Sequence, residues 1–363
     1  MNTGRKMKNQ PIHHIAKIVC LGLVFGLPNA VLETASADEN QAKLLAQRED
    51  LGTSASTKSE GPRERPDVPL IVEQGGVLLK KGHLVIEPSV DFSLVETNRA
   101  EVAGFTVLPA ILIGNFNISQ VVRETITTAL TARVGITNRL EFEARIPFVY
   151  RNDRETRRPI GSGSSADETI NINGHGLGDI EFAAHYQIND GSGGLPYFVG
   201  NLRAKSDTGK SPFDVSVDSS GNPTDLPTGN GFWSLQPSIT MILPSDPAVL
   251  FGNLNYTWNI ARTVGGFGKI DPGDSFGGSL GIGFALNEKL SLSMAYDHTY
   301  VLETKQSGTK TNSTLHIGRA LFGGSYRMSD KSSVNLNVGI GVTEQAPDVS
   351  TTLRVPITLQ PFN

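Results

Sequence analysis

The sequence predicts an all-β fold, an antiparallel transmembrane outer-membrane β-barrel of about 12 strands, or 14, with short periplasmic turns and longer outer loops. Three observations support this fold class. Apolar and polar residues alternate over most of the chain, many alternating segments are longer than an ordinary strand of about 5 to 6 residues, and short connections alternate with long ones from residue 137 onward. A tilted strand needs about 9 to 11 residues to cross a bilayer. Both the segment lengths and the loop pattern therefore favour a barrel over a soluble sandwich.

The first 37 residues are predicted to be a signal peptide. Arg5, Lys6 and Lys8 give the start of the chain a positive charge, and an apolar run follows over residues 18–27. Small residues at 35–37 (Ala-Ser-Ala) then form a cleavage signature. The chain is therefore expected to be exported.

Residues 38–68 are predicted to form a disordered or weakly helical periplasmic tail, because they contain few large apolar residues. The barrel is predicted to occupy residues 69–363. The one cysteine, Cys20, lies in the signal peptide, so the mature chain offers no thiolate for a metal or for nucleophilic chemistry. Lys+Arg 32 against Asp+Glu 36 gives a net charge of −4, which argues against a nucleic-acid partner.

The segment 139–151 shows the alternation most clearly. Successive side chains of a strand point to opposite faces of the sheet. One face is then apolar and the other charged: the first carries Leu140, Phe142, Ala144, Ile146, Phe148 and Tyr150, and the second carries Glu141, Glu143, Arg145 and Arg151. We interpret the apolar face as the lipid-facing one.

Similar alternation predicts thirteen strand segments: 83–95, 105–118, 123–136, 139–151, 178–189, 195–205, 231–243, 248–261, 276–286, 289–303, 313–328, 332–343 and 348–359. A barrel with both termini on one side needs an even number of strands. Either 83–95 is a plug or rim element, which leaves 12, or 105–118 bends at Pro109 into two strands, which gives 14. We favour 12.

The predicted inner face carries many charges, and these must be hydrated or paired. The candidate lumen-lining residues are Glu87, Asp91, Arg133, Glu141, Glu143, Arg145, Asp179, Glu181, His185, Arg203, Asp297 and Arg354. In a water-filled lumen they would create a transverse field that tunes permeation. If they instead pair across a narrow interior, they form a closed structural network. A barrel of twelve strands is compatible with either arrangement.

Other candidate chemistry is weak. Residues 204–211 resemble a phosphate-binding loop, but Pro212 follows instead of the helix that such a loop requires. The loop near 206–230 is therefore expected to be solvated. Asp297 and His298 are adjacent in a predicted strand, so their side chains should point to opposite faces rather than form a catalytic pair. No catalytic residue, metal site or cofactor is predicted.

Four motifs resemble the MetA-pathway of phenol degradation family of outer-membrane proteins. They lie at 75–88 (GGVLLKKGHLVIEP), 130–141 (LTARVGITNRLE), 176–180 (GLGDI) and 342–348 (VTEQAPD). The resemblance covers about residues 75–359, and its motifs fall at turns and strand ends. It implies a barrel that takes up aromatic or other hydrophobic compounds, and it brings no catalytic residues.

One departure concerns the C-terminus, which ends Phe362-Asn363, whereas barrel proteins commonly end in an aromatic residue that the assembly machinery reads. Together, these observations predict a channel or transporter in the outer membrane of a Gram-negative bacterium for passive passage of small molecules. The alternatives are a non-conducting structural barrel and an outer-membrane hydrolase. The expected partners are outer-membrane lipid and lipopolysaccharide, the barrel assembly machinery and the small-molecule cargo.

Overall fold

The computed structural model describes residues 78–97, 119–157, 168–191, 194–219, 223–245, 247–311 and 313–360. The predicted signal peptide, the predicted tail and the segment 105–118 lie outside these residues. None of the described residues forms a helix long and apolar enough to cross a bilayer.

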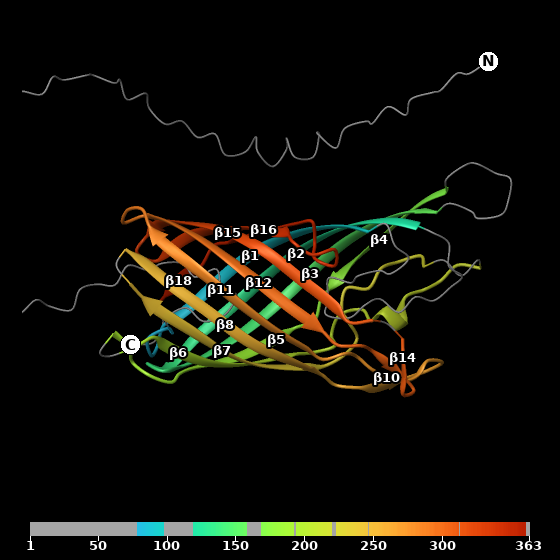
Figure 1. Cartoon of the computed structure of the whole chain (residues 1–363), viewed down its shortest axis with the longest axis horizontal. Coiled ribbons are helices and arrows are strands. Elements are labelled where there is room, and N and C mark those ends of the chain that lie inside the picture. The colour runs from blue at the N-terminus through green and yellow to red at the C-terminus, as the bar shows by residue number, and fades with distance from the viewer. Residues whose placement is uncertain are drawn as a thin grey trace, which may run out of the picture. The chain divides into compact units, whose positions relative to one another are not determined.

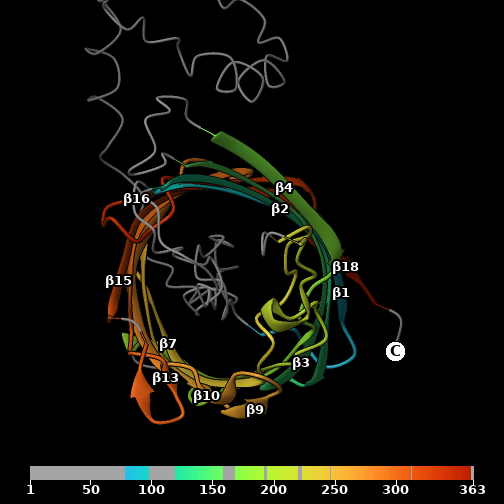
Figure 2. The same cartoon turned by 90° about the vertical axis from the view of Figure 1, so that its right-hand side faces the viewer.

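One antiparallel sheet of 14 strands closes into the barrel (Figures 1 and 2). The 14 strands fill 12 positions, because β4 with β5 and β17 with β18 each share one position. The number of positions matches the prediction of 12. The strands are β1 (Leu84–Thr97), β2 (Ser119–Thr137), β3 (Leu140–Arg157), β4 (Glu168–Leu177), β5 (Glu181–Gln187), β6 (Tyr197–Lys205), β7 (Ser234–Pro244), β8 (Ala248–Asn259), β11 (Ser275–Ala285), β12 (Leu290–Val301), β15 (Leu315–Ser329), β16 (Ser332–Gly341), β17 (Val349–Arg354) and β18 (Ile357–Leu359).

Strand β1 closes the barrel. It pairs with β2 along its whole length, and on its other edge it pairs with β17 and β18. The interpretation of 83–95 as a plug or rim element was therefore wrong: this segment is a wall strand. Because each wall strand has a neighbour on both sides, the closed sheet satisfies the backbone groups that lipid could not.

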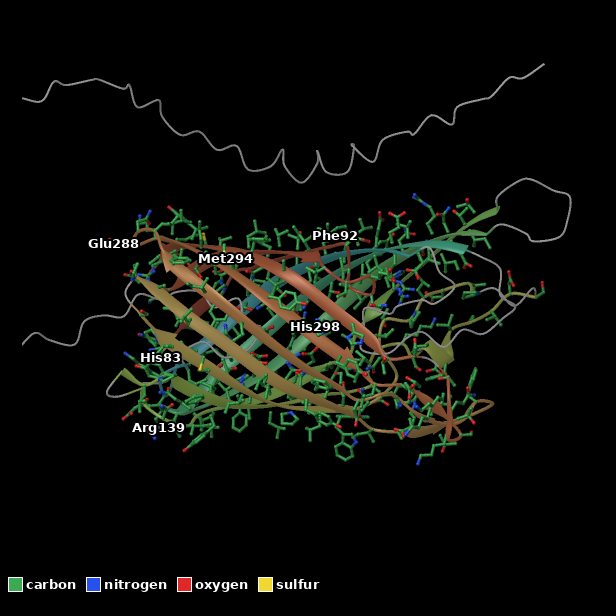
Figure 3. The ribbon with its side chains drawn as sticks, viewed as in Figure 1. His83, Phe92, Arg139, Glu288, Met294 and His298 are labelled. Atoms are coloured by element: carbon green, nitrogen blue, oxygen red, sulfur yellow. The ribbon has the colours of Figure 1, made fainter. Side chains whose placement is uncertain are left out.

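The two ends of the barrel differ in their connections. Short turns join β2 to β3, β11 to β12 and β15 to β16, and Figure 3 shows Arg139 and Glu288 together at that end. The long connections lie at the other end, where β10 (Gly268–Asp271) and β14 (Thr309–Lys310) are labelled in Figure 1. There, β9 (Arg262–Val264), β10, β13 (Lys305–Gln306) and β14 form a separate small sheet. Alternating loop lengths are typical of outer-membrane barrels.

The outer surface is apolar. Leu280 is 71% exposed and Phe182 is 53% exposed, and Figure 3 shows Met294 and Phe92 on this surface. Even-numbered positions of β3 carry the exposed Phe142, Phe148 and Tyr150. The alternation of the sequence therefore assigns the faces correctly.

Strand β3 is longer than the sequence predicts, and it pairs with a strand, β4, that the sequence does not predict. The segment 152–177 was expected to be a loop, but β3 continues to Arg157 and β4 pairs with its outer half. The pattern reverses here: Ile172 is buried, whereas the outward Arg154 donates to Asn171 Oδ1 at 3.2 Å. A hairpin that projects beyond the apolar belt has no lipid to face, so its outer side is polar.

Candidate channel lumen

The predicted lumen residues lie on the parity opposite to the exposed apolar side chains. The structure places Glu87 and Asp91 on β1, Arg133 on β2, Glu141, Glu143 and Arg145 on β3, Glu181 and His185 on β5, Arg203 on β6, Asp297 on β12 and Arg354 on β17, while Asp179 lies in the break between β4 and β5. The strand alternation therefore brings all of these charges except Asp179 to one side of the sheet.

A ladder of ion pairs begins at β1 and β2. Arg133 Nη2 lies 3.0 Å from Glu87 Oε2 on β1, and Arg133 Nε lies 4.0 Å from Glu143 Oε2 on β3. One guanidinium thus serves carboxylates on both neighbouring strands. All three side chains are largely buried, so each charge needs its partner.

Arg145 extends the ladder. Its Nη2 reaches past β2 to Asp91 Oδ2 on β1, at 3.1 Å, and its Nη1 lies 3.3 Å from Glu181 Oε1 on β5. Glu181 in turn lies 3.4 Å from Arg203 Nη1 on β6. Asp91 also accepts a hydrogen bond from Thr352, at 2.7 Å.

These ion pairs run along the wall from β1 to β6, and they join adjacent strands or strands two apart. Such pairs are satisfied without any contact between opposite sides of the barrel. The sequence allows charges that face a water-filled lumen or charges that pair across a narrow interior. These ion pairs run between nearby strands of the wall and do not cross the interior.

Two predicted residues have structural partners close to the short-turn end. His185 is 2% exposed, with Nδ1 2.8 Å from Asn201 Oδ1 and Nε2 3.8 Å from Glu143 Oε2. Glu141 accepts a hydrogen bond from the backbone N–H of Leu79, at 2.9 Å, and so fixes the chain that leads into β1.

Asp179 anchors the connection between β6 and β7. It is 6% exposed and accepts hydrogen bonds from the backbone N–H groups of Gly209 and Asn230, both at 3.0 Å, and from Lys205 Nζ, at 2.7 Å. Asp179 therefore fixes the β6–β7 connection to the barrel wall, and its charge is used there rather than facing the lumen free.

The expectation of a solvated loop at 206–230 was wrong for much of this segment. Ser206, Ser211 and Asn230 are buried, and Thr228 donates to the carbonyl oxygen of Leu177 at 2.7 Å. The physical reason is the break in the wall: β3 accepts the hydrogen bond of the Gly178 N–H, but the N–H of Ile180 and the carbonyl oxygens of Gly178 and Ile180 need other partners. The loop provides them.

The phosphate-loop pattern has another role in this segment. The backbone N–H of Gly209 is used by Asp179, and Lys210 pairs with Asp225. Only the three-residue 3₁₀ turn η2 (Pro212–Asp214) follows. Among the described residues, no group of three or more His, Cys, Asp or Glu side chains is placed to hold a metal ion.

Asp297 and His298 point to opposite faces, as predicted. Asp297 accepts hydrogen bonds from Arg319 on β15, with Nε at 3.1 and 3.2 Å from the two carboxylate oxygens. His298 Nδ1 instead lies 3.0 Å from the hydroxyl of Tyr296, among the outward aromatic rings.

Several partners were missed from the sequence. Arg319 was missed because its segment has Gly318 and Ala320 where lipid-facing residues should be large and apolar, so the alternation is faint. The pairs from Arg123 and Arg151 to Asp153, at 2.8 and 3.1 Å, were missed because Asp153 lies in the stretch 152–177, which was expected to be loop.

A polar cavity of about 200 Å³ lies inside the barrel. Its lining carries three arginines and one aspartate, and is otherwise mostly amide and hydroxyl side chains: Arg203, Gln236, Ser238, Asn253, Asn255, Gly278, Ser279, Asp297, Thr299, Arg319, Leu321, Asn337, Gly339, Ser350, Thr352 and Arg354. Three of the twelve predicted residues, Arg203, Asp297 and Arg354, thus meet at one cavity. Its neutral polar members come from β7, β8, β11, β12, β16 and β17.

Comparison with known structures supports the fold. An outer membrane channel from Pseudomonas putida F1 is similar over 79% of this chain and 100% of its own, with 16% identity and a TM-score of 0.55. More distant matches are the CymD monoaromatic hydrocarbon channel (9% identity, 77% of this chain and 88% of its own, TM-score 0.40) and the Ralstonia pickettii toluene transporter TbuX (9%, 81% and 91%, TM-score 0.38).

The sequence also matches a family profile over residues 97–357, which is most of the barrel. This match confirms the resemblance seen in the turn and strand-end motifs. The chain belongs to the family described as the MetA-pathway of phenol degradation.

Proposed function

We propose that the protein is a passive channel of the Gram-negative outer membrane that lets small molecules, including aromatic and other hydrophobic compounds, pass through its lumen. The observation that carries this proposal is the inner wall. Its charges pair along the wall instead of across it, and its other side is lined by neutral polar groups such as Asn253 and Asn337. A wall of this kind is suited to hydrated solutes.

The cargo class rests on the family. The family description refers to phenol degradation, and a degradation pathway needs its aromatic substrate to enter the cell. A channel has no need of catalytic groups, and the proposal assigns none. Outer-membrane lipid, lipopolysaccharide and the barrel assembly machinery are its proposed partners.

Liposome swelling with the purified, refolded chain tests the proposal. A neutral sugar and phenol are offered in turn. In the variant Asn337→Trp, a large ring is placed on the inner wall at the polar cavity. The control Leu336→Trp places the same ring one position away, on the opposite face of β16.

A conducting lumen predicts swelling with phenol or with the sugar, slower swelling for Asn337→Trp and an unchanged rate for Leu336→Trp. If folded, heat-modifiable protein gives no swelling with either solute, the barrel is a structural, non-conducting one. Equal slowing by both variants would also count against passage through the lumen.

A further inference from the structure

Arg354, the last residue of β17, places on the inner face of the barrel a positive charge with which no residue of the described ranges pairs. Its Cα partners are the neutral Ser89 on β1 and Asn335 on β16. Within the described ranges, no ion pair or hydrogen bond engages its half-buried guanidinium. The side chain therefore offers five N–H donors and a charge that pH does not remove.

The other arginines at the same cavity already have acidic partners. Arg319 binds Asp297 through both carboxylate oxygens, and Arg203 pairs with Glu181 at 3.4 Å. Their charges are thus compensated within the wall, whereas none of the residues that the structure describes compensates the charge of Arg354. A solute in the cavity meets a net positive charge at this position.

The remaining lining of the cavity suits an anion. Gln236, Asn255 and Thr352 can donate or accept hydrogen bonds, and the cavity carries three arginines against one aspartate. A carboxylate has two coplanar oxygens that match the fork of a guanidinium, and such bidentate, charge-assisted pairs are the strong ones. Neutral aromatic compounds have no group that matches it.

We propose that Arg354 is the binding site for the carboxylate of small organic acids, aromatic acids above all, in transit through the lumen. The proposal rests on the proposed channel function, because the acid reaches this position through the barrel. It narrows the cargo from aromatic compounds in general to those that carry a negative charge.

The experiment compares benzoate with benzyl alcohol, which has the same ring without the charge. Calorimetric titration of the detergent-solubilised full chain with benzoate measures binding, and liposome swelling measures passage of each solute. The variants are Arg354→Gln, which removes the charge, and Arg354→Lys, which keeps the charge but loses the planar fork.

The native chain should bind benzoate and pass it faster than benzyl alcohol. Arg354→Gln should weaken benzoate binding by about 10- to 100-fold, the loss expected for charge-assisted hydrogen bonds, and should slow benzoate passage far more than benzyl alcohol passage. The benzoate affinity of Arg354→Lys should lie between those of the native chain and of Arg354→Gln.

The two proposals can fail separately. If both solutes pass but benzoate has no advantage and Arg354→Gln changes nothing, the carboxylate site is refuted and the channel stands. If benzoate binds in an Arg354-dependent manner but neither solute passes, the site stands and the channel function is refuted.

Discussion

Leu280→Arg tests the assignment of the lipid-facing surface most directly. Leu280 is the central residue of β11, is 71% exposed, and has Gly252 and Tyr296 as Cα partners. A residue at the middle of a wall strand lies close to the bilayer midplane, where an arginine on the lipid face costs about 2–4 kcal/mol. At about 1.4 kcal/mol per factor of ten, the folding equilibrium constant should fall by about 30- to 700-fold.

Ser279→Arg is the matched control, since it places the same charge one position away on the inner face. Its Cα partners are Asn253 and Asp297, and it lines the polar cavity, so we expect a change within about 0.5 kcal/mol. The assay is a urea titration in phosphatidylcholine vesicles, with the folded fraction read from heat-modifiable mobility on a gel. Equal losses for the two variants, or a larger loss for Ser279→Arg, would refute the assignment of the faces.

Two further predictions concern the connection between β6 and β7. Gly229→Ala should release this segment from the wall and make it sensitive to protease, because an added Cβ would overlap a carboxylate oxygen of Asp179. The hydrogen bond from Lys210 holds the pKa of Asp225 below its ordinary value. At a pH above the unfolded-state pKa of Asp225, its ionised carboxylate pairs with Lys210 and stabilises the docked segment. That contribution is lost as the pH falls through the folded-state value, so acid should increase cleavage by an acid-active protease.

Each of these predictions has a control. Gly265→Ala adds a Cβ where no atom lies within 4 Å, so it should leave protease sensitivity unchanged, and a matching increase there would contradict the steric argument. In the variant Lys210→Met, the increase in protease cleavage at acid pH should be smaller than in the native chain. If it persists in full, the pairing of Lys210 with Asp225 does not cause it.

The sequence predicts the barrel well where lipid imposes the pattern. Along residues 140–150, the bilayer demands a large apolar residue at every second position, and local alternation is enough to find both faces. Beyond the apolar belt this demand disappears, so β4 was missed even though Ile170 and Ile172 alternate with Asn171 and Asn173.

The ion-pair partners were harder to predict, for a different reason. The inward direction of Arg145 follows from its parity, but its pairing with Asp91, 54 positions away, depends on how β1 and β3 are aligned through β2. The role of Asp179 depends on a loop that folds back onto a break in the wall. Neither relation leaves a periodic trace in the sequence.

Closure of the barrel by β1 and β17 also has a consequence for biosynthesis. The hydrogen bond between Thr352 and Asp91 joins residues that are 261 positions apart, so the seam forms only after almost the whole chain has been delivered. Contacts of such long range make folding slow. Until the seam forms, both end strands present open edges that invite aggregation. A chain of this design therefore needs protection during its transit, and its last strand controls when the wall becomes complete.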